Sequence, residues 1–235
     1  LILASNVFAH SDKLKEMAEC MLALLSQKGT IVIEVQYLMN TLKDLTFDNI
    51  YHEHYNYWSL TSLVNFFSKL NTKIFRSEKI ETHGGSLRIY LKKDKKVKIE
   101  SSVKNMLREE EKFGIKKFKT YQKFGESVYK IRDNVRQNIN KLKKNNLIIG
   151  YGAPAKATTI LNYFGLSDSH LKFTVDDNNL KHNKFIPGTN IEIKSLESVN
   201  PLDYDYVLVL AWNFYEQIKK SNKQYFSKAK FIKLK

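Results

Sequence analysis

The sequence predicts an α/β protein built from the last part of a doubly wound sheet, a helical connector and a second, Rossmann-like unit. In residues 1–70, short apolar runs alternate with segments of helical periodicity, which is typical of parallel strands joined by crossover helices. Two strand-like segments then follow at 73–80 and 87–91, as an antiparallel hairpin does at the edge of such a sheet. From residue 147 the alternation of strands and helices begins again.

The first sheet is expected within residues 1–91. Apolar and β-branched runs predict its strands, and apolar residues at helical spacing predict the helices between them. Because the chain opens on a strand and without an initiator methionine, we expect the first strands of this sheet to precede it. The expected elements are a strand at 1–5, a helix capped by Ser11 or Asp12 and closing at Gly29, a strand at 30–35, a helix from Ser59 to about Leu70, and the hairpin.

Residues 92–235 are expected to form a second domain, with a helical connector at 92–146 and the Rossmann-like unit at 147–235. Residues 101–146 have a long helical pattern, with apolar residues recurring every three or four positions from Phe118 to Leu142. We expect Gly114 and Gly125 to weaken this pattern and break it into two pieces. The elements expected after it are a strand at 147–149, a turn at 150–156, a helix at 157–163, and strands at 171–175, 206–210 and 230–234.

The charge is uneven along the chain. It holds 39 Lys and Arg against 24 Asp and Glu, a formal net charge of +15, and residues 92–146 contribute +11 of that excess. Most of the basic residues are Lys, which lacks the planar fork that Arg uses to read bases and phosphates. We interpret the excess as the solvated face of the connector and do not expect a nucleic-acid partner, although a basic nucleic-acid-binding protein stays an alternative.

Two classes of protein are excluded by composition. The single cysteine, Cys20, rules out a disulfide scaffold and a multi-cysteine metal site built from this chain alone. No apolar run approaches the ~18 residues that a membrane helix needs, and no signal segment is present. We therefore expect a cytoplasmic protein with no membrane partner, and the sequence does not define its oligomeric state.

The densest cluster of functional type is the run Tyr51-His52-Glu53-His54-Tyr55, in which three ionisable residues follow one another between aromatic residues. It lies where ligands bind in α/β sheets, and a carboxylate beside an imidazole favours a histidine base near neutral pH. Two other interpretations stay open from the residues alone. The histidines can be metal ligands together with His83 or Glu81, or the run can be an ordered polar loop.

Three further features carry weaker signals. His10 follows the first strand and is either functional or an ordinary residue at a helix start. The glycines at 84–85 either let the backbone approach a ligand or simply form the hairpin connection. The turn Gly150-x-Gly152, with Lys156 after it and Asp176 at the next strand end, is half of a dinucleotide fingerprint. It makes a nucleotide-sugar oxidoreductase or another Rossmann enzyme the alternative enzyme function.

Several blocks together resemble the S-adenosylmethionine-dependent sugar C-methyltransferases, which act on nucleotide-linked keto-deoxysugars. The most specific are Tyr51-His52-Glu53-His54 and Thr82-His83-Gly84-Gly85-Ser86-Leu87-Arg88. The resemblance spans the chain in order, through residues 4–10, 33–35, 47–54, 57–60, 82–88, 150–156, 175–178 and 187–189.

The resemblance implies a fold, a reaction and a cofactor. Residues 1–91 would be the C-terminal part of a class I methyltransferase domain, and 92–235 the C-terminal domain of the family. S-adenosylmethionine would donate a methyl group to the carbon beside the ketone of a nucleotide-diphosphate keto-sugar, through a base-generated enolate. Zinc is expected only in an N-terminal module that this chain lacks, along with the glycine-rich cofactor loop, and the site itself is expected to hold no metal.

The resemblance also implies residue roles. His54 would be the base and Glu53 would orient it, while Tyr51 and His10 would contact the sugar or stabilise the enolate. Asn6 and Val7 would border the methionine end of the cofactor. The residues expected to bind the substrate are His83, Gly84, Arg88, Gly150, Gly152 and Lys156.

Overall fold

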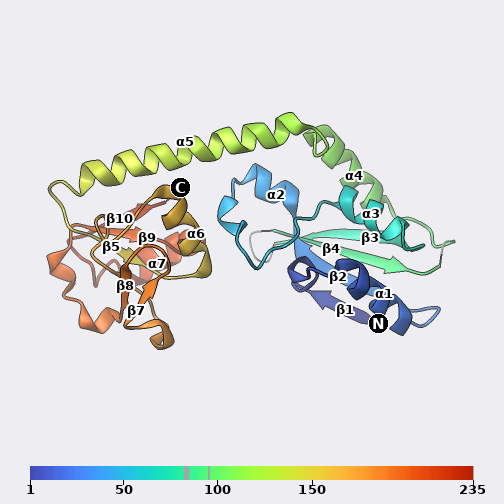
Figure 1. The fold of residues 1–235 in the computed structure, drawn as a ribbon, viewed down its shortest axis with the longest axis horizontal. Coiled ribbons are helices and arrows are strands. Elements are labelled where there is room, and N and C mark those ends of the chain that lie inside the picture. The colour runs from blue at the N-terminus through green and yellow to red at the C-terminus, as the bar shows by residue number, and fades with distance from the viewer. Residues whose placement is uncertain (82–84, 95, 235) are drawn as a thin grey trace. The chain divides into compact units, whose positions relative to one another are not determined.

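The computed structural model describes residues 1–81, 85–94 and 96–234. The chain divides into two compact units, each with its own sheet (Figure 1). The first comprises Leu1–Phe47 and His52–Gly125, and the second comprises Asp48–Tyr51 and Glu126–Lys235. The expected division at residues 91 and 92 concerns family domains and stays a prediction.

The sheet of the first unit has the strand order β1-β2-β4-β3. Strands β1 (Ile2–Ser5) and β2 (Ile31–Gln36) are parallel, and Ala4 pairs with Ile33. Strand β4 (Ser86–Lys92) runs antiparallel to both β2 and β3 (Lys73–Ile80). The predicted mixed α/β fold, with a hairpin completing a parallel arrangement, is therefore confirmed.

Four helices of the described chain belong to this unit: α1 (Leu14–Leu24), α2 (Leu38–Lys43), α3 (Leu60–Ser68) and α4 (Ser101–Phe113). Ser59 caps α3 as predicted, in a reciprocal capping box with Ser62. The predicted cap of α1 is wrong. Its N-cap is Lys13, whose side chain has no acceptor for a capping bond. The Ser11 hydroxyl accepts a hydrogen bond from the Lys13 amide, before the first residue of the helix, and so does not cap it.

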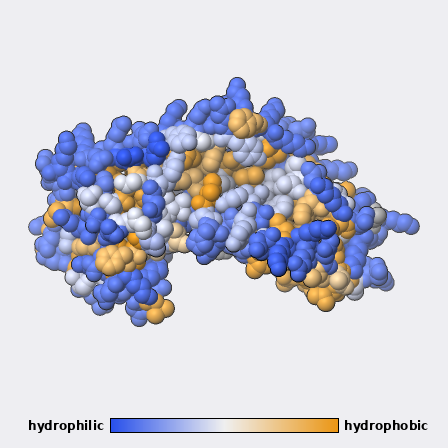
Figure 2. Space-filling model, viewed as in Figure 1, coloured by the Kyte–Doolittle hydropathy of each residue, from blue (hydrophilic) through white to orange (hydrophobic). Residues whose placement is uncertain are grey.

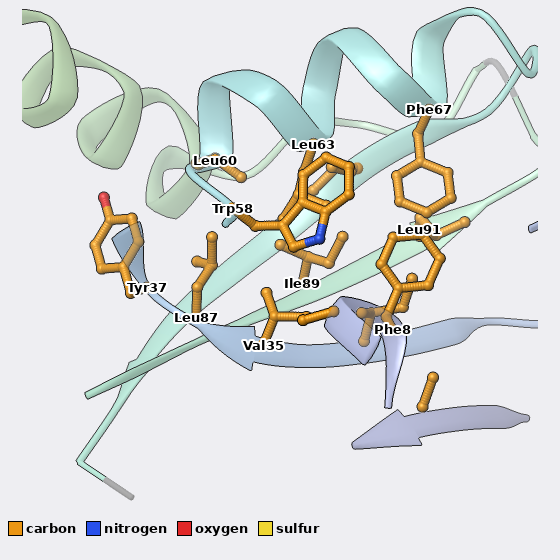
Figure 3. Packing of buried hydrophobic residues seen from close by; sticks show 14 of the residues in the cluster. Phe8, Val35, Tyr37, Trp58, Leu60, Leu63, Phe67, Leu87, Ile89 and Leu91 are labelled. Atoms are coloured by element: carbon orange, nitrogen blue, oxygen red, sulfur yellow. The ribbon is translucent and has the colours of Figure 1, made fainter. Parts of the chain in front are cut away.

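An aromatic cluster forms the core beneath the helices (Figure 3). Phe8 is fully buried, with its ring centroid 5.7 Å from that of Phe67 and 5.7 Å from that of Trp58. Leu63 of α3 and Ile89 of β4 complete the contact between helix and sheet. This cluster joins the segment after β1 to the segment before α3, which are the two segments that carry the candidate histidines.

The sheet of the second unit has the strand order β10-β9-β5-β6-β8-β7. Its strands are parallel except for β7, which pairs antiparallel with β8. Helices α6 (Ala155–Phe164) and α7 (Tyr215–Asn222) belong to the same unit. The strands are β5 (Ile148–Tyr151), β6 (Thr174–Val175), β7 (Lys184–Ile186), β8 (Ile191–Lys194), β9 (Tyr206–Val209) and β10 (Lys230–Lys233).

The connector forms α4 and the long helix α5 (Phe118–Leu142). Gly114 ends α4 in a left-handed conformation with φ of +84°, as an αL cap requires. The predicted break at Gly125 is wrong, because Gly125 lies inside α5. A solvent-facing glycine costs only about 1 kcal/mol relative to alanine, and 24 other residues propagate the helix.

The surface of the connector is strongly polar, and the face shown in Figure 2 is mostly hydrophilic along α5. Its Lys and Arg side chains account for the charge excess noted above. Within the described ranges, no helix has the length and apolar character that crossing a membrane requires.

Candidate active site

Two histidines lie against each other at the carboxyl end of β1. His10 closes the short helical turn Phe8–His10, and its ring centroid is 4.8 Å from that of His54. His10 Nδ1 lies 2.8 Å from the carbonyl oxygen of Glu53. A carbonyl oxygen only accepts, so Nδ1 carries the proton and the Nε2 of a neutral His10 is an acceptor. The structure thus brings together two residues that are 44 positions apart in the sequence.

Backbone contacts hold the two histidine segments in this arrangement. The Asn56 amide donates to the Ala9 carbonyl at 3.2 Å, and its side-chain Nδ2 donates to the Ser11 carbonyl at 3.0 Å. The ring of Tyr57 meets His54 edge to face, with centroids 6.3 Å apart. These hydrogen bonds, together with the one between the His10 ring and the Glu53 carbonyl, fix the position of the two histidine segments relative to each other.

The other residues of the same run differ in their surroundings. Glu53 is exposed, and the bond to His10 uses its main-chain carbonyl. His54 is half-buried, whereas His52 is exposed. Tyr51 is half-buried and belongs to the second compact unit, in which the Asp48 carboxylate accepts a 2.8 Å hydrogen bond from Trp212 Nε1. The roles of Glu53 and Tyr51 stay predictions.

The metal interpretation gains no support from the part of the chain that the structure describes, where no group of three or more His, Cys, Asp or Glu side chains converges as metal ligands do. His83, one of the ligands considered, lies outside the described residues, as does Gly84. The predicted substrate roles of these two residues are therefore left as predictions.

Asn6 and Val7 follow the last residue of β1. Asn6 has a φ of +55°, and its amide donates to the Glu34 carbonyl at 2.9 Å, so the chain turns sharply at the strand end. Val7 is 48% exposed, an unusual value for a valine next to the core. A polar amide beside an exposed apolar side chain, at the carboxyl end of a parallel strand, fits a ligand with both polar and apolar parts, as S-adenosylmethionine has.

Arg88 lies on β4 and forms ion pairs within the sheet. Its Nη2 lies 2.7 Å and its Nε 2.9 Å from Glu34 Oε2, and its Nη1 lies 3.8 Å from Glu78. The hydrogen bond to Glu34 is the main cause that raises the pKa of Arg88. This guanidinium lines a hollow of about 620 Å³ with β1 and β3 residues, and the structure does not bring it together with the histidines by any bond it shows.

A second crevice lies in the second unit, at the carboxyl ends of β5, β6 and β9, and has a volume of about 420 Å³. The Tyr151 hydroxyl donates to the oxygens of Asp177 at 3.1 Å and Asn222 at 3.3 Å. Burial, followed by the nearby Asp177 carboxylate, raises the pKa of Tyr151 to about 12, so the hydroxyl stays a donor. The sequence alone did not single out Asp177 or Asn222, although two adjacent aspartates at the end of a strand indicate a polar site there.

The Asp176 carboxylate binds the Gly150–Lys156 turn, where a phosphate was expected to bind. Its Oδ2 accepts from the Ala153 amide at 2.6 Å and from Lys181 Nζ at 3.0 Å, while Oδ1 accepts from the Asn178 amide at 2.9 Å. Burial alone would raise the pKa of Asp176, but these two amides and the Lys181 ammonium lower it below its ordinary value. A carboxylate of the protein thus occupies the turn, which disfavours a dinucleotide pyrophosphate there.

The glycines of that turn have packing reasons of their own. A Cβ on Gly150 would come within 2.6 Å of Thr174 Oγ1. Gly152 has a φ of +88°, and a Cβ there would meet Ala211 at 3.0 Å. Lys156 is half-buried in the first turn of α6. Gly152 lines the crevice, whereas Gly150 and Lys156 do not, and the substrate roles of all three stay predictions.

Comparison with known proteins shows the family to which the chain belongs. Residues 81–234 match the family described as the C-methyltransferase C-terminal domain. The C-methyltransferase NovU of Streptomyces niveus is 32% identical over 229 residues, which cover 96% of this chain and 54% of that protein. The chain therefore spans about half the length of this relative. Because the family match takes in well over half of its residues, the chain belongs to the C-methyltransferases that carry this C-terminal domain.

Proposed function

We propose that the protein transfers a methyl group from S-adenosylmethionine to the carbon beside the ketone of a nucleotide-linked keto-deoxysugar. The observation that carries the proposal is the pair His10–His54, with ring centroids 4.8 Å apart at the carboxyl end of β1. The name of the relative, a C-methyltransferase, supports transfer to carbon. Because the chain spans 54% of this relative, the whole reaction is part of the proposal.

The proposed reaction requires this chain to remove a proton from carbon. A ketone acidifies the neighbouring C–H bond, and a neutral imidazole, with an ordinary pKa of ~6.5, is a suitable base near pH 7. His54 takes this proton, and the electron pair of the broken C–H bond moves into the ketone to give an enolate. S-adenosylmethionine, when bound, supplies the electrophilic methyl group.

The neighbours of His54 then hold and stabilise the reacting groups. His10 donates its Nδ1 proton to the Glu53 carbonyl, which leaves Nε2 as the ring nitrogen that can contact a ligand. A protonated His10, or the hydroxyl of Tyr51, would donate to the enolate oxygen or to the sugar. Glu53 orients or assists His54, and its main-chain carbonyl accepts the hydrogen bond from His10 Nδ1.

Binding residues are assigned around this centre. Asn6 and Val7 hold the methionine end of the cofactor, and His83, Gly84 and Arg88 contact the substrate. Gly150, Gly152 and Lys156 are further substrate-binding residues in the second unit, where the crevice that Gly152 lines has room for part of a nucleotide. Since Asp176 already satisfies the turn amide, the hydroxyl-rich portion of that nucleotide suits the crevice better than its phosphates do.

The test is a substitution of the base. In His54→Gln we expect kcat for methyl transfer to fall at least ~100-fold, the usual size of a general-base contribution. Solvent deuterium exchange at the carbon beside the ketone should fall by a similar factor, while the Kd of S-adenosylmethionine stays within twofold. His52→Gln is the matched control, because His52 is the exposed neighbour in the same run.

Retained deuterium exchange in His54→Gln would remove His54 from the role of base. A large loss in His52→Gln would instead favour the metal interpretation, in which both histidines are ligands. If the unaltered protein shows neither exchange nor methyl transfer with any nucleotide-linked keto-sugar, the proposed substrate class is wrong.

A further inference from the structure

The first unit contains a fully buried carboxylate that the proposed chemistry does not use. Glu110 lies on α4 and is 0% exposed. Its Oε1 accepts hydrogen bonds from the Leu60 amide at 2.6 Å and the Tyr37 hydroxyl at 2.9 Å. Its Oε2 accepts from the Thr61 amide at 2.8 Å and the Thr61 hydroxyl at 2.6 Å. All four partners are donors, so both oxygens act only as acceptors, as in an ionised carboxylate.

These bonds fix the start of α3 from a helix about 50 residues away. The first amides of a helix have no partner inside it, and the helix dipole favours a negative charge at this end. Ser59 serves the Ser62 amide, and Glu110 serves those of Leu60 and Thr61. The first turn of α3 is therefore bound on two sides, by its own cap and by α4.

Tyr37 extends this attachment to the end of β2. Burial, together with the neighbouring Glu110 carboxylate, raises the pKa of Tyr37 well above its ordinary value, so its hydroxyl remains a donor. The residue after Tyr37, Leu38, donates its amide to the Trp58 carbonyl at 2.9 Å. Glu110 thus holds two points, the strand end and the helix start, on either side of Trp58.

Trp58 connects these points to the histidine pair. Its ring packs on Phe8, two residues before His10, and Tyr57 beside it contacts the His54 ring. A displacement of the α3 start would move the segment 54–59 and, through Phe8, the turn that carries His10. The path from Glu110 to the histidines therefore consists of one hydrogen-bonded helix start and two aromatic contacts, Trp58 with Phe8 and Tyr57 with His54.

We propose that Glu110 is a positioning residue for the His10–His54 pair, acting through the start of α3. The inference rests on the proposed function for its effect on turnover, but its effect on the histidine rings is independent of any reaction. A buried charge is a poor source of stability, because its desolvation offsets most of what its partners return. The four donors that converge on Glu110 fix the positions of the segments that carry them, which an apolar side chain at this position would not do.

The test compares Glu110→Gln with Glu109→Gln, the same chemical change one residue earlier. Glu109 is half exposed and pairs with Lys79, so it serves as the surface control. An amide at position 110 turns one acceptor oxygen into a donor that faces donors. We expect kcat and deuterium exchange to fall 10- to 100-fold in Glu110→Gln, with the Kd of S-adenosylmethionine within twofold, and to stay within twofold in Glu109→Gln.

A second readout does not need turnover. The ring signals of His10 and His54 in ¹H–¹³C spectra of the unliganded protein, assigned by their own substitutions, should shift or broaden in Glu110→Gln. Those of His170 and His182, in the second unit, should not. If the histidine signals move but the unaltered protein shows no methyl transfer, the proposed function fails and the positioning role stands.

Unchanged histidine signals in a folded Glu110→Gln protein would overturn the inference, and so would an equal loss of cofactor affinity and kcat. If that variant does not fold, Tyr37→Phe and Thr61→Ala each remove one hydroxyl donor and leave the carboxylate in place. We expect kcat to fall about 2- to 10-fold in each, with displaced signals of His54. Two folded variants with unaltered kcat and signals would also overturn it.

Discussion

The carboxyl ends of the two sheets carry different chemistry on a related α/β plan. The end of the first sheet presents two imidazoles, held by main-chain bonds and an aromatic core. That of the second sheet presents the Tyr151 phenol, which donates to Asp177 and Asn222, and the Asp176 carboxylate, which accepts from the Ala153 amide. The first set suits moving a proton, whereas the second suits recognising hydroxyl and amide groups. The fold supplies the position, and the side chains at that position supply the function.

The largest loss of stability should come from removing an aromatic ring that packs beneath the carboxyl end of the first sheet. Phe8→Ala removes a fully buried ring that contacts both Trp58 and Phe67, and such truncations cost about 3–5 kcal/mol of unfolding free energy. We expect faster amide exchange in peptides of residues 1–47 and 52–125, measured by mass spectrometry, and unchanged exchange in residues 126–234. Equal loosening of both units would show that they do not fold as separate compact bodies.

A smaller effect on the unfolding free energy is expected at the carboxyl end of the second sheet, and it should depend on pH. Asp176 has a pKa lowered in the folded state, so its contribution to stability is full above its ordinary pKa of ~3.9 and is lost as the pH falls through the lower, folded value. Asp176→Asn should lower the unfolding free energy by about 1–3 kcal/mol at pH 7, the range for bonds to a charged group.

Urea denaturation between pH 3 and 7 measures this effect. The difference between the unaltered protein and Asp176→Asn should be constant from pH 7 to about 5 and should shrink below the ordinary aspartate pKa of ~3.9. A difference that grows as the pH falls would mean that Asp176 is held as a neutral acid. Asp176 would then not be a charged acceptor at the carboxyl end of the second sheet, as described above.

The smallest effect should follow from Tyr151→Phe, which removes one hydroxyl and leaves its two acceptors in place. Loss of a neutral hydrogen bond costs about 0.5–1.5 kcal/mol, and the crevice is open to water that can replace the hydroxyl. In calorimetric titrations we expect weaker binding of a nucleoside diphosphate, by less than about tenfold, with cofactor affinity unchanged. Unaltered nucleotide affinity would indicate that the phenol serves structure alone.

Local signals in the sequence predicted what depends on neighbouring residues. Ser59 caps α3 and Gly114 ends α4, because both features are decided within one helical turn. Gly125 was misread since a single glycine is outweighed by a long helix around it. The short strands β7 and β8 were not predicted, because segments of three and four residues depend on their pairing within the sheet.

In the candidate site, too, residue types could be predicted from the sequence, whereas contacts between distant residues could not. The run 51–55 and His10 could be named from their residue types and the family resemblance, but their contact depends on the turn after β1 and on the Asn56 bonds. Nothing in the sequence singled out Glu110, which stands among other charged residues on a polar helix. Its importance arises only from burial, which a one-dimensional pattern of charges does not reveal.

The position of Glu110 also bears on how such proteins can be recombined. The matched family region begins at residue 81, yet the donors that surround this carboxylate come from Tyr37, Leu60 and Thr61, all upstream of that point. A chimera joined at residue 81 would bring a foreign buried charge to a helix start that did not evolve with it. A junction inside α5, near the limit of the first compact unit at Gly125, would keep the carboxylate with its own donors.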